Sequence, residues 1–461
     1  MVDRRLAVAA AMRAKPLIVA LAVAAATPLA ASPLLSPDRL DDAATGGDGF
    51  ATVGDFAWRA FIALNWPAAG RGTPDRAKTI GDPGPRVWET FKSATETFPV
   101  DADGRRLAPT PWESFAGPNP CGGEATEKTI AAFTPFAEFN QPSFSTDAPA
   151  NPLVARNGEY VRYETRFNAL EFATFAANGW SEGRNLPDVE HPAHFPVGSI
   201  ALKAAWRPLN AADSPAARAR YYVTRAAIVD VAGTLAAGHI LCKPRDIALV
   251  GLHIAIKTPT RPQWIWASFE HVDNVPPAGV GAAREPDAAD AQAPYGFFDP
   301  ARAAKLWPPF GAAATLPIDA TNPPKPAPAA MQIVRRHPIN AALMATNRDY
   351  WAQSAVKGTV WEHYMLVAAQ WPTSSDPPGP ANDGAYFPGR EAPRDDTYKS
   401  TAAAQENLVN TTLESYLQEA PSSCMGCHQA ASNQNGFDFV GALAHVASEQ
   451  PVRRPTRRKA Q

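Results

Sequence analysis

Several signatures of common function classes are missing from this chain. It has no P-loop, no glycine-rich dinucleotide fingerprint and no Ser, His and Asp in an order typical of serine hydrolases. Charge of either sign is scarce, since only 19% of residues are charged and 43 Lys and Arg nearly balance 45 Asp and Glu. Without a basic excess, we expect no nucleic-acid partner. Any indication of function must therefore come from other residue types, and cysteine is the first of them.

Cysteine is also scarce, and its four positions are informative. Two of the four cysteines lie in the pentapeptide Cys424-Met425-Gly426-Cys427-His428. This CxxCH spacing predicts covalent attachment of haem c, because two thiols can form thioethers to one porphyrin while the adjacent imidazole faces the iron. A thioredoxin-like pair would precede most of a βαβ unit, and a zinc site would need a second closely spaced cysteine pair. We therefore predict one haem c bound through Cys424 and Cys427, with His428 as proximal iron ligand.

No methionine follows Met425, which excludes a downstream methionine as second iron ligand. The distal ligand is either upstream, local or absent. The first candidate is His253, because a hairpin between residues 257 and 264 would place His253, Trp266 and Glu270 on one face. An open or water-bound site is the alternative to any side chain. The other candidate ligands are His271, His337, His363, His445, Met331, Met344 and Met365.

The N-terminus has the pattern of a secretory signal peptide. A basic stretch that includes Arg4, Arg5 and Lys15 precedes an apolar, alanine-rich run at residues 17–26 and small residues near 30–32. We predict a signal peptide at residues 1–31, periplasmic localisation and no stable membrane span, with an uncleaved anchor as the alternative. In an oxidising compartment the remaining pair, Cys121 and Cys242, is expected to form a disulfide.

The layout predicts an α+β fold: an antiparallel β-sheet block flanked by helices, with a short helical haem c segment packed on it. The high proline count, 47, argues against long helical bundles. We expect a large α+β domain at 45–400 with a β-rich centre at 160–275, a haem c attachment segment at 403–448, and a basic disordered tail at 449–461. Strands are predicted at 199–206, 220–230, 247–257 and 263–272, and helices at 56–67, 359–371, 411–419 and 437–447.

The chain resembles the c-type cytochromes, on the CxxCH motif. More narrowly, residues 56–67, 251–254, 262–274 and 423–428 resemble a group of exported bacterial proteins called cytochrome c family proteins. The resemblance implies a single haem c near the C-terminus and export, and it names no substrate. Function is expected to be electron transfer with a periplasmic redox partner. The alternatives are a peroxidase- or oxygenase-like haem enzyme with an exchangeable distal site, whose catalytic residues would be unknown, and a haem-based sensor or binding protein.

Overall fold

The structure is a computed structural model of the 461-residue chain. The chain divides into two units, residues 1–34 and 35–461, and every residue described below belongs to the second. The predicted signal peptide and the basic tail lie outside the described residues. These are 50–101, 105–114, 129–130, 153–188, 190–229, 241–259, 261, 264–277, 295–301, 332–371, 408–415, 418, 424, 428 and 436–448.

The described helices are short apart from α1 and α6. They are α1 (Phe50–Leu64), α2 (Ala94–Thr97), α3 (Ala169–Ala177), α4 (Pro215–Arg218), α6 (Ala341–Ala352) and α9 (Gly441–Ser448). Three single turns of 3₁₀-helix, η3 (Trp88–Thr90), η4 (Trp180–Glu182) and η7 (Val360–His363), connect larger elements.

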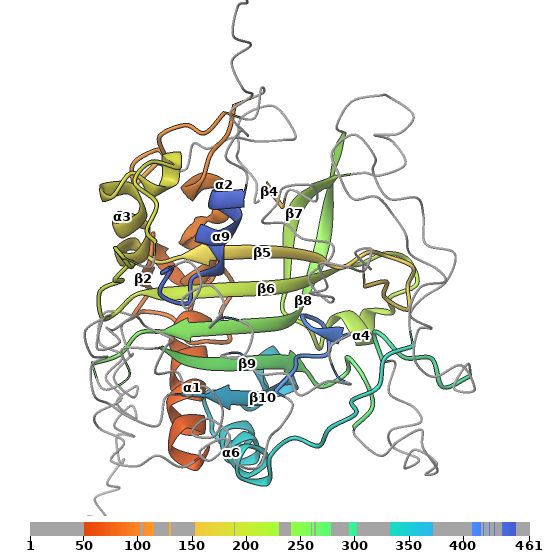
Figure 1. The fold of residues 1–461 in the computed structure, drawn as a ribbon. Coiled ribbons are helices and arrows are strands. Elements are labelled where there is room, and N and C mark those ends of the chain that lie inside the picture. The colour runs from red at the N-terminus through yellow and green to blue at the C-terminus, as the bar shows by residue number, and fades with distance from the viewer. Residues whose placement is uncertain are drawn as a thin grey trace, which may run out of the picture. The chain divides into compact units, whose positions relative to one another are not determined.

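The centre of the unit is an eight-stranded, largely antiparallel sheet (Figure 1). Its strands are β3 (Lys92–Ser93), β4 (Thr129–Ile130), β5 (Arg162–Phe167), β6 (Ile200–Pro208), β7 (Val223–Val229), β8 (Cys242–Ile256), β9 (Ile265–His271) and β10 (Tyr364–Gln370). The order is β10-β9-β8-β6-β5-β3, with β7 on the first half of β8 and β4 parallel to β7. A separate pair joins β1 (Ala68–Gly70) to β2 (Thr73–Pro74).

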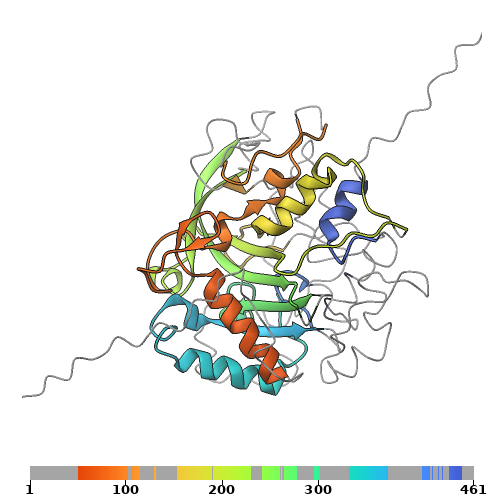
Figure 2. The ribbon, with the colours of Figure 1, turned by 90° about the vertical axis from the view of Figure 1, so that its left-hand side faces the viewer.

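One face of the sheet packs against α1 and α6. Phe269 of β9 stacks on Phe61 of α1 and meets Trp58 edge-on, with ring centroids 4.3 and 5.3 Å apart. Trp58 also donates a hydrogen bond to the Asn347 side chain of α6, at 2.8 Å. Figure 2 shows α1 and α6 side by side. This aromatic layer removes a large apolar area from water and fixes the helices to the sheet.

The opposite face carries the C-terminal residues. Tyr163 of β5 donates a hydrogen bond to the Thr412 carbonyl at 2.8 Å. Near the β3–β5 side, α9 shares a buried apolar cluster with α2, α3 and the Trp264–Trp266 region (Figure 1). Gly251 of β8 permits this close approach, because a Cβ there would overlap the Thr412 hydroxyl. The sheet therefore lies between α1 and α6 on one face and the C-terminal residues on the other.

The predicted fold class is confirmed: the structure is α+β, with an antiparallel sheet and a few flanking helices. The four predicted strands correspond to β6, β7, β8 and β9, and the first predicted helix is α1. Strand β5 was not predicted. The described residues contain no helix with the length and hydropathy needed to cross a membrane.

Three predicted helices are corrected. The stretch 359–371 forms η7 and then strand β10, because its apolar run pairs with β9 and is buried on both faces. Residues 411–414 form a turn, since the threonine hydroxyls bond to Glu270 and Asn410. The last helix begins at Gly441 and not at 437, because Asp438 and Phe439 have positive φ.

Candidate functional site

His428 has one ring nitrogen committed to the backbone. Its Nδ1 lies 2.8 Å from the carbonyl oxygen of Phe439. A carbonyl can only accept, so Nδ1 carries the proton and Nε2 keeps its lone pair. Burial lowers the pKa of His428 to about 4, so the ring is neutral at neutral pH. A neutral imidazole with Nδ1–H bonded to a carbonyl is the form in which histidine binds metals through Nε2.

Trp266 of β9 lies against this imidazole. The two ring centroids are 4.3 Å apart with an interplanar angle of 42°. Trp266 is 9% exposed, and its Nε1–H has no hydrogen-bond partner among the described residues. An unpaired buried donor costs about 1–3 kcal/mol, so its position beside His428 calls for an acceptor there. A polar group of a bound ligand is one way to supply it.

Cys424 packs against the same apolar cluster that contains Trp264, Trp266, Phe437 and Phe439. Its thiol is not part of a disulfide. Cys427, the second predicted attachment residue, lies outside the described residues. Cys424 and His428 are therefore both partly exposed at the edge of an aromatic cluster, which offers apolar contacts to a flat macrocycle.

His253 occupies the place that the hairpin argument predicted. It pairs with Ser268 across β8 and β9, with Trp266 and Glu270 as its diagonal neighbours on one face. Its Nε2 is bonded to the carboxylate of Glu414. Burial opposes ionisation of Glu414. Attraction to His253 and a hydrogen bond from the Asn410 backbone amide outweigh this effect, so the pKa of Glu414 is lowered. Because Nε2 is engaged by Glu414, iron ligation through that atom would require this pair to open.

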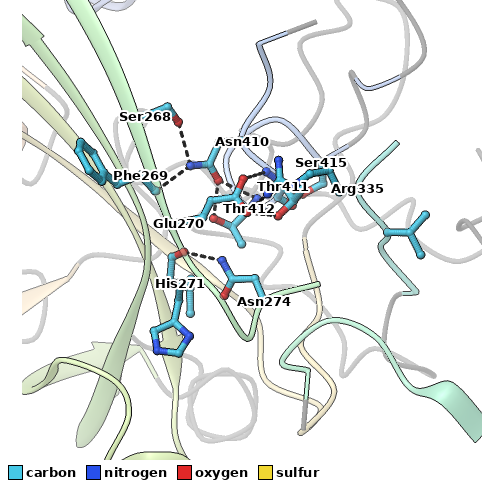
Figure 3. Close-up of polar contacts among 12 residues, drawn as sticks. Ser268, Phe269, Glu270, His271, Asn274, Arg335, Asn410, Thr411, Thr412 and Ser415 are labelled. Carbon is cyan, nitrogen blue, oxygen red and sulfur yellow. Dashed lines mark hydrogen bonds and ion pairs between the residues drawn. The ribbon is translucent and has the colours of Figure 1, made fainter. Parts of the chain in front are cut away.

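The C-terminal residues are joined to the sheet by a buried polar network (Figure 3). The Thr411 hydroxyl donates to the Glu270 carboxylate at 2.6 Å, and Arg335 pairs with the same carboxylate at 2.6 Å. The Asn410 amide donates to the Ser268 hydroxyl at 3.0 Å. Glu270 is fully buried, so its charge depends on these partners. The network fixes residues 410–415 beside His253 and Glu270.

The other distal candidates are scattered. His271 is fully buried, and its ring stacks on Tyr221 with centroids 3.7 Å apart. His363 lies 6.0 Å from the His271 ring, and His337 Nε2 donates to the Gln418 carbonyl. Met344 lies 3.5 Å from the Asn347 amide, and Met365 packs with Val367 and Leu408. Met331 and the side chain of His445 lie outside the described residues.

The predicted disulfide is only half described. Cys242, the first residue of β8, is disulfide-bonded. Its predicted partner, Cys121, lies outside the described residues, so the pairing stays a prediction.

Known proteins give no match to this chain. No family model matches it, and neither a curated protein nor a solved structure is significantly similar to it. In the part of the chain that the structure describes, no group of three or more His, Cys, Asp or Glu is arranged to hold a metal ion. The expected membership of the c-type cytochromes, and of the exported cytochrome c family proteins, is therefore wrong as a family assignment. The CxxCH pentapeptide remains a property of the sequence alone.

Sequence reasoning missed several residues around His428. Glu414 holds His253, and Asp438 bonds with Lys257 beside the Phe439 carbonyl. A signal was present for two of them: Lys257 directly follows the largely apolar run at 247–256, and Asp438 stands between two phenylalanines. A charged residue inside an apolar run indicates a buried ion pair, because an isolated buried charge is too costly.

Proposed function

We propose that the chain binds one haem covalently through thioethers to Cys424 and Cys427, with His428 Nε2 as axial ligand, and that it transfers electrons. The observation that carries the proposal is the hydrogen bond from His428 Nδ1 to the Phe439 carbonyl. That bond leaves Nε2 as a lone-pair donor, and it holds the ring in one orientation. When bound, the haem would supply a one-electron couple between ferric and ferrous iron.

The surroundings of His428 suit electron transfer. The half-buried imidazole lies against Trp266, which is buried together with the aromatic cluster around Phe437 and Phe439. Burial in an apolar, rigid site limits solvent rearrangement when the charge on the iron changes, and it lets the protein tune the potential. In this proposal the chain's residues orient the ligand, keep its ring neutral and exclude water from it.

The proposed setting is the periplasm. The basic and apolar pattern of residues 1–31 supports export. The disulfide at Cys242 supports an oxidising compartment, because disulfides are rare in reducing ones. The electron donor and acceptor would be other periplasmic redox proteins.

One observation favours a second candidate function, that of a haem enzyme. His253 is held by Glu414, and a histidine positioned by a carboxylate is a common arrangement for general acid–base catalysis. Both side chains are partly exposed, at 21% and 19%. If a bound haem left its sixth position open, His253 would be the candidate general base on this face of the sheet.

Optical spectroscopy separates these candidates. Electron transfer predicts a six-coordinate, low-spin spectrum that does not change when peroxide or carbon monoxide is added. A high-spin spectrum, with peroxide reactivity that falls at least tenfold in His253→Gln, would move the assignment to an enzyme. The exposed His191→Gln variant is the matched control, since the side chain of His191 is 83% exposed.

A further inference from the structure

Three residues preceding α9 have a left-handed backbone. Gly436, Asp438 and Phe439 have φ of 69°, 48° and 66°. Glycine is required at 436, because a Cβ would overlap the carbonyl of Asp188. The left-handed conformation is unfavourable for a residue with a side chain, above all for Phe439, and it persists only where surrounding contacts impose it. The contacts that hold this turn therefore indicate its structural role.

Asp438 is fully buried, and three groups from the sheet region bind it. Its carboxylate forms an ion pair with Lys257 and accepts a hydrogen bond from the Phe195 amide at 2.8 Å. The Trp264 indole donates to the Asp438 carbonyl at 3.0 Å. Lys257 directly follows β8, and its own amide donates to the Ser199 carbonyl. The turn is thus tied to the ends of β6 and β8.

The next carbonyl in the turn, that of Phe439, is the acceptor for His428 Nδ1. A continuous path runs from Lys257 through Asp438 and Phe439 to the His428 ring. We propose that Asp438, anchored by Lys257, is the positioning residue that fixes the orientation and tautomer of His428. This inference rests on the proposed function, in which His428 is the iron ligand. It adds the reason for the strained turn: the turn places one carbonyl at hydrogen-bond distance from the ring.

The ion pair has further acidic and basic neighbours. Glu171 of α3 is fully buried, and neither of its carboxylate oxygens has a partner among the described residues. Burial and the nearby Asp438 raise the pKa of Glu171, while Lys257 opposes the rise. His194 is half-buried, and both Asp438 and Lys257 act on it electrostatically. Glu171 and His194 are therefore the titratable groups that face the Lys257–Asp438 ion pair.

The experiment is nitrogen NMR of the full chain labelled with ¹⁵N-histidine and prepared without haem. Wild type should show His428 as a single neutral tautomer with the proton on Nδ1. In Asp438→Ala and Lys257→Met, the two ring nitrogens should move toward each other, as expected for a mixture of tautomers. Asp438→Asn should be intermediate, because asparagine tolerates positive φ and keeps an acceptor for the Phe195 amide.

Asp213→Ala is the matched control. It removes a buried aspartate from the Arg207–Asp213 ion pair, whose side chains are 5% and 7% exposed. It should lower stability without changing the His428 signals. In the haem-loaded chain, Asp438→Ala should raise the reduction potential, since a ligand that loses its hydrogen bond becomes less basic. The control should leave the potential unchanged.

The outcomes are separable. Unchanged His428 signals in Asp438→Ala would overturn the inference, whether or not the chain takes up haem. If Asp438→Ala does not fold, unchanged signals in folded Asp438→Asn would overturn it equally. A wild-type chain without covalent haem would refute the proposed function, and the tautomer measurement would still judge the role of Asp438.

Discussion

The buried acid Glu171 makes the free energy of unfolding depend on pH. Its folded-state pKa is raised, chiefly by burial, above the usual 4.5. A raised pKa means that the folded chain holds this proton more tightly than the unfolded chain. Its contribution to stability is therefore complete below pH 4.5 and is lost as pH rises through the folded pKa.

We predict that Glu171→Gln removes this dependence. The variant should match wild type near pH 4 and gain about 1.4 kcal/mol over it for each pH unit up to the folded pKa of Glu171. Chemical denaturation at a series of pH values measures the difference. The exposed Glu190→Gln is the control and should show no such gain. A pH-independent difference between Glu171→Gln and wild type would contradict the assignment.

The stability contribution of His271 has the opposite pH dependence to that of Glu171. Burial lowers its pKa from 6.5 to about 3, and its Nε2 donates to the Arg220 carbonyl while its Nδ1 accepts from the Asp273 amide. The folded chain thus resists protonation of this ring. Its contribution to stability is complete above pH 6.5 and declines as pH falls toward 3.

We predict that the free energy of unfolding of wild type falls between pH 6.5 and 4 more steeply than that of His271→Gln, by about 1.4 kcal/mol per pH unit. Urea denaturation at several pH values tests this. His191→Gln, at an exposed position, should keep the wild-type slope. Equal slopes for wild type and His271→Gln would show that His271 takes up its proton without unfolding.

At the scale of elements, the four predicted strands lie where β6, β7, β8 and β9 form, whereas the prediction of a helix at 359–371 was wrong. The two-residue period of a strand, with a hairpin between residues 257 and 264, predicts His253, Trp266 and Glu270 on one face, and the register of β8 and β9 agrees. The run 364–370 is buried on both faces, so it shows no alternation and resembles a buried helix. Asp438 and Lys257 are 181 residues apart in sequence, and no local pattern specifies that contact.

Gly251 is the point where the C-terminal residues approach β8 most closely. We predict that Gly251→Ala forces residues 410–415 away from the sheet, because its Cβ would overlap the Thr412 hydroxyl. The expected loss of stability is about 1–3 kcal/mol, as for other overpacked sites. Hydrogen exchange should show earlier loss of protection in this segment than in β6.

Gly70→Ala is the matched control, since nothing lies within 4 Å of a Cβ at that position. It should change neither stability nor exchange. Full protection of residues 410–415 in Gly251→Ala would contradict the close contact between Gly251 and Thr412.

At the scale of the whole molecule, composition and strand count sufficed to predict the α+β class, whereas the family assignment was wrong. The motif region depends on distant parts of the chain: Ser268, Glu270 and Lys257 all come from the sheet and all bind C-terminal residues. A short motif specifies a chemistry, but the surface that completes its site is formed by residues more than a hundred positions away.

We therefore predict that residues 403–461 expressed alone do not form a stable haem protein. The fragment lacks the sheet groups that neutralise or anchor Asp438, Thr411 and Asn410. Exported with the haem-attachment machinery, it should give little holoprotein, or a haem that binds added imidazole freely. A stable fragment with the spectrum of the full chain would show that the sheet serves another purpose.

The central claim is that Cys424 and Cys427 hold a haem covalently, and the most direct test is extraction of the denatured protein. The full chain, exported together with haem-attachment machinery, should keep its haem through acid–acetone extraction and show a mass increased by one haem. Cys424→Ala with Cys427→Ala should lose it, whereas the matched double variant Cys121→Ala with Cys242→Ala should retain it. Free extraction of haem from wild type, or a wild-type mass equal to that of the polypeptide alone, would contradict the account.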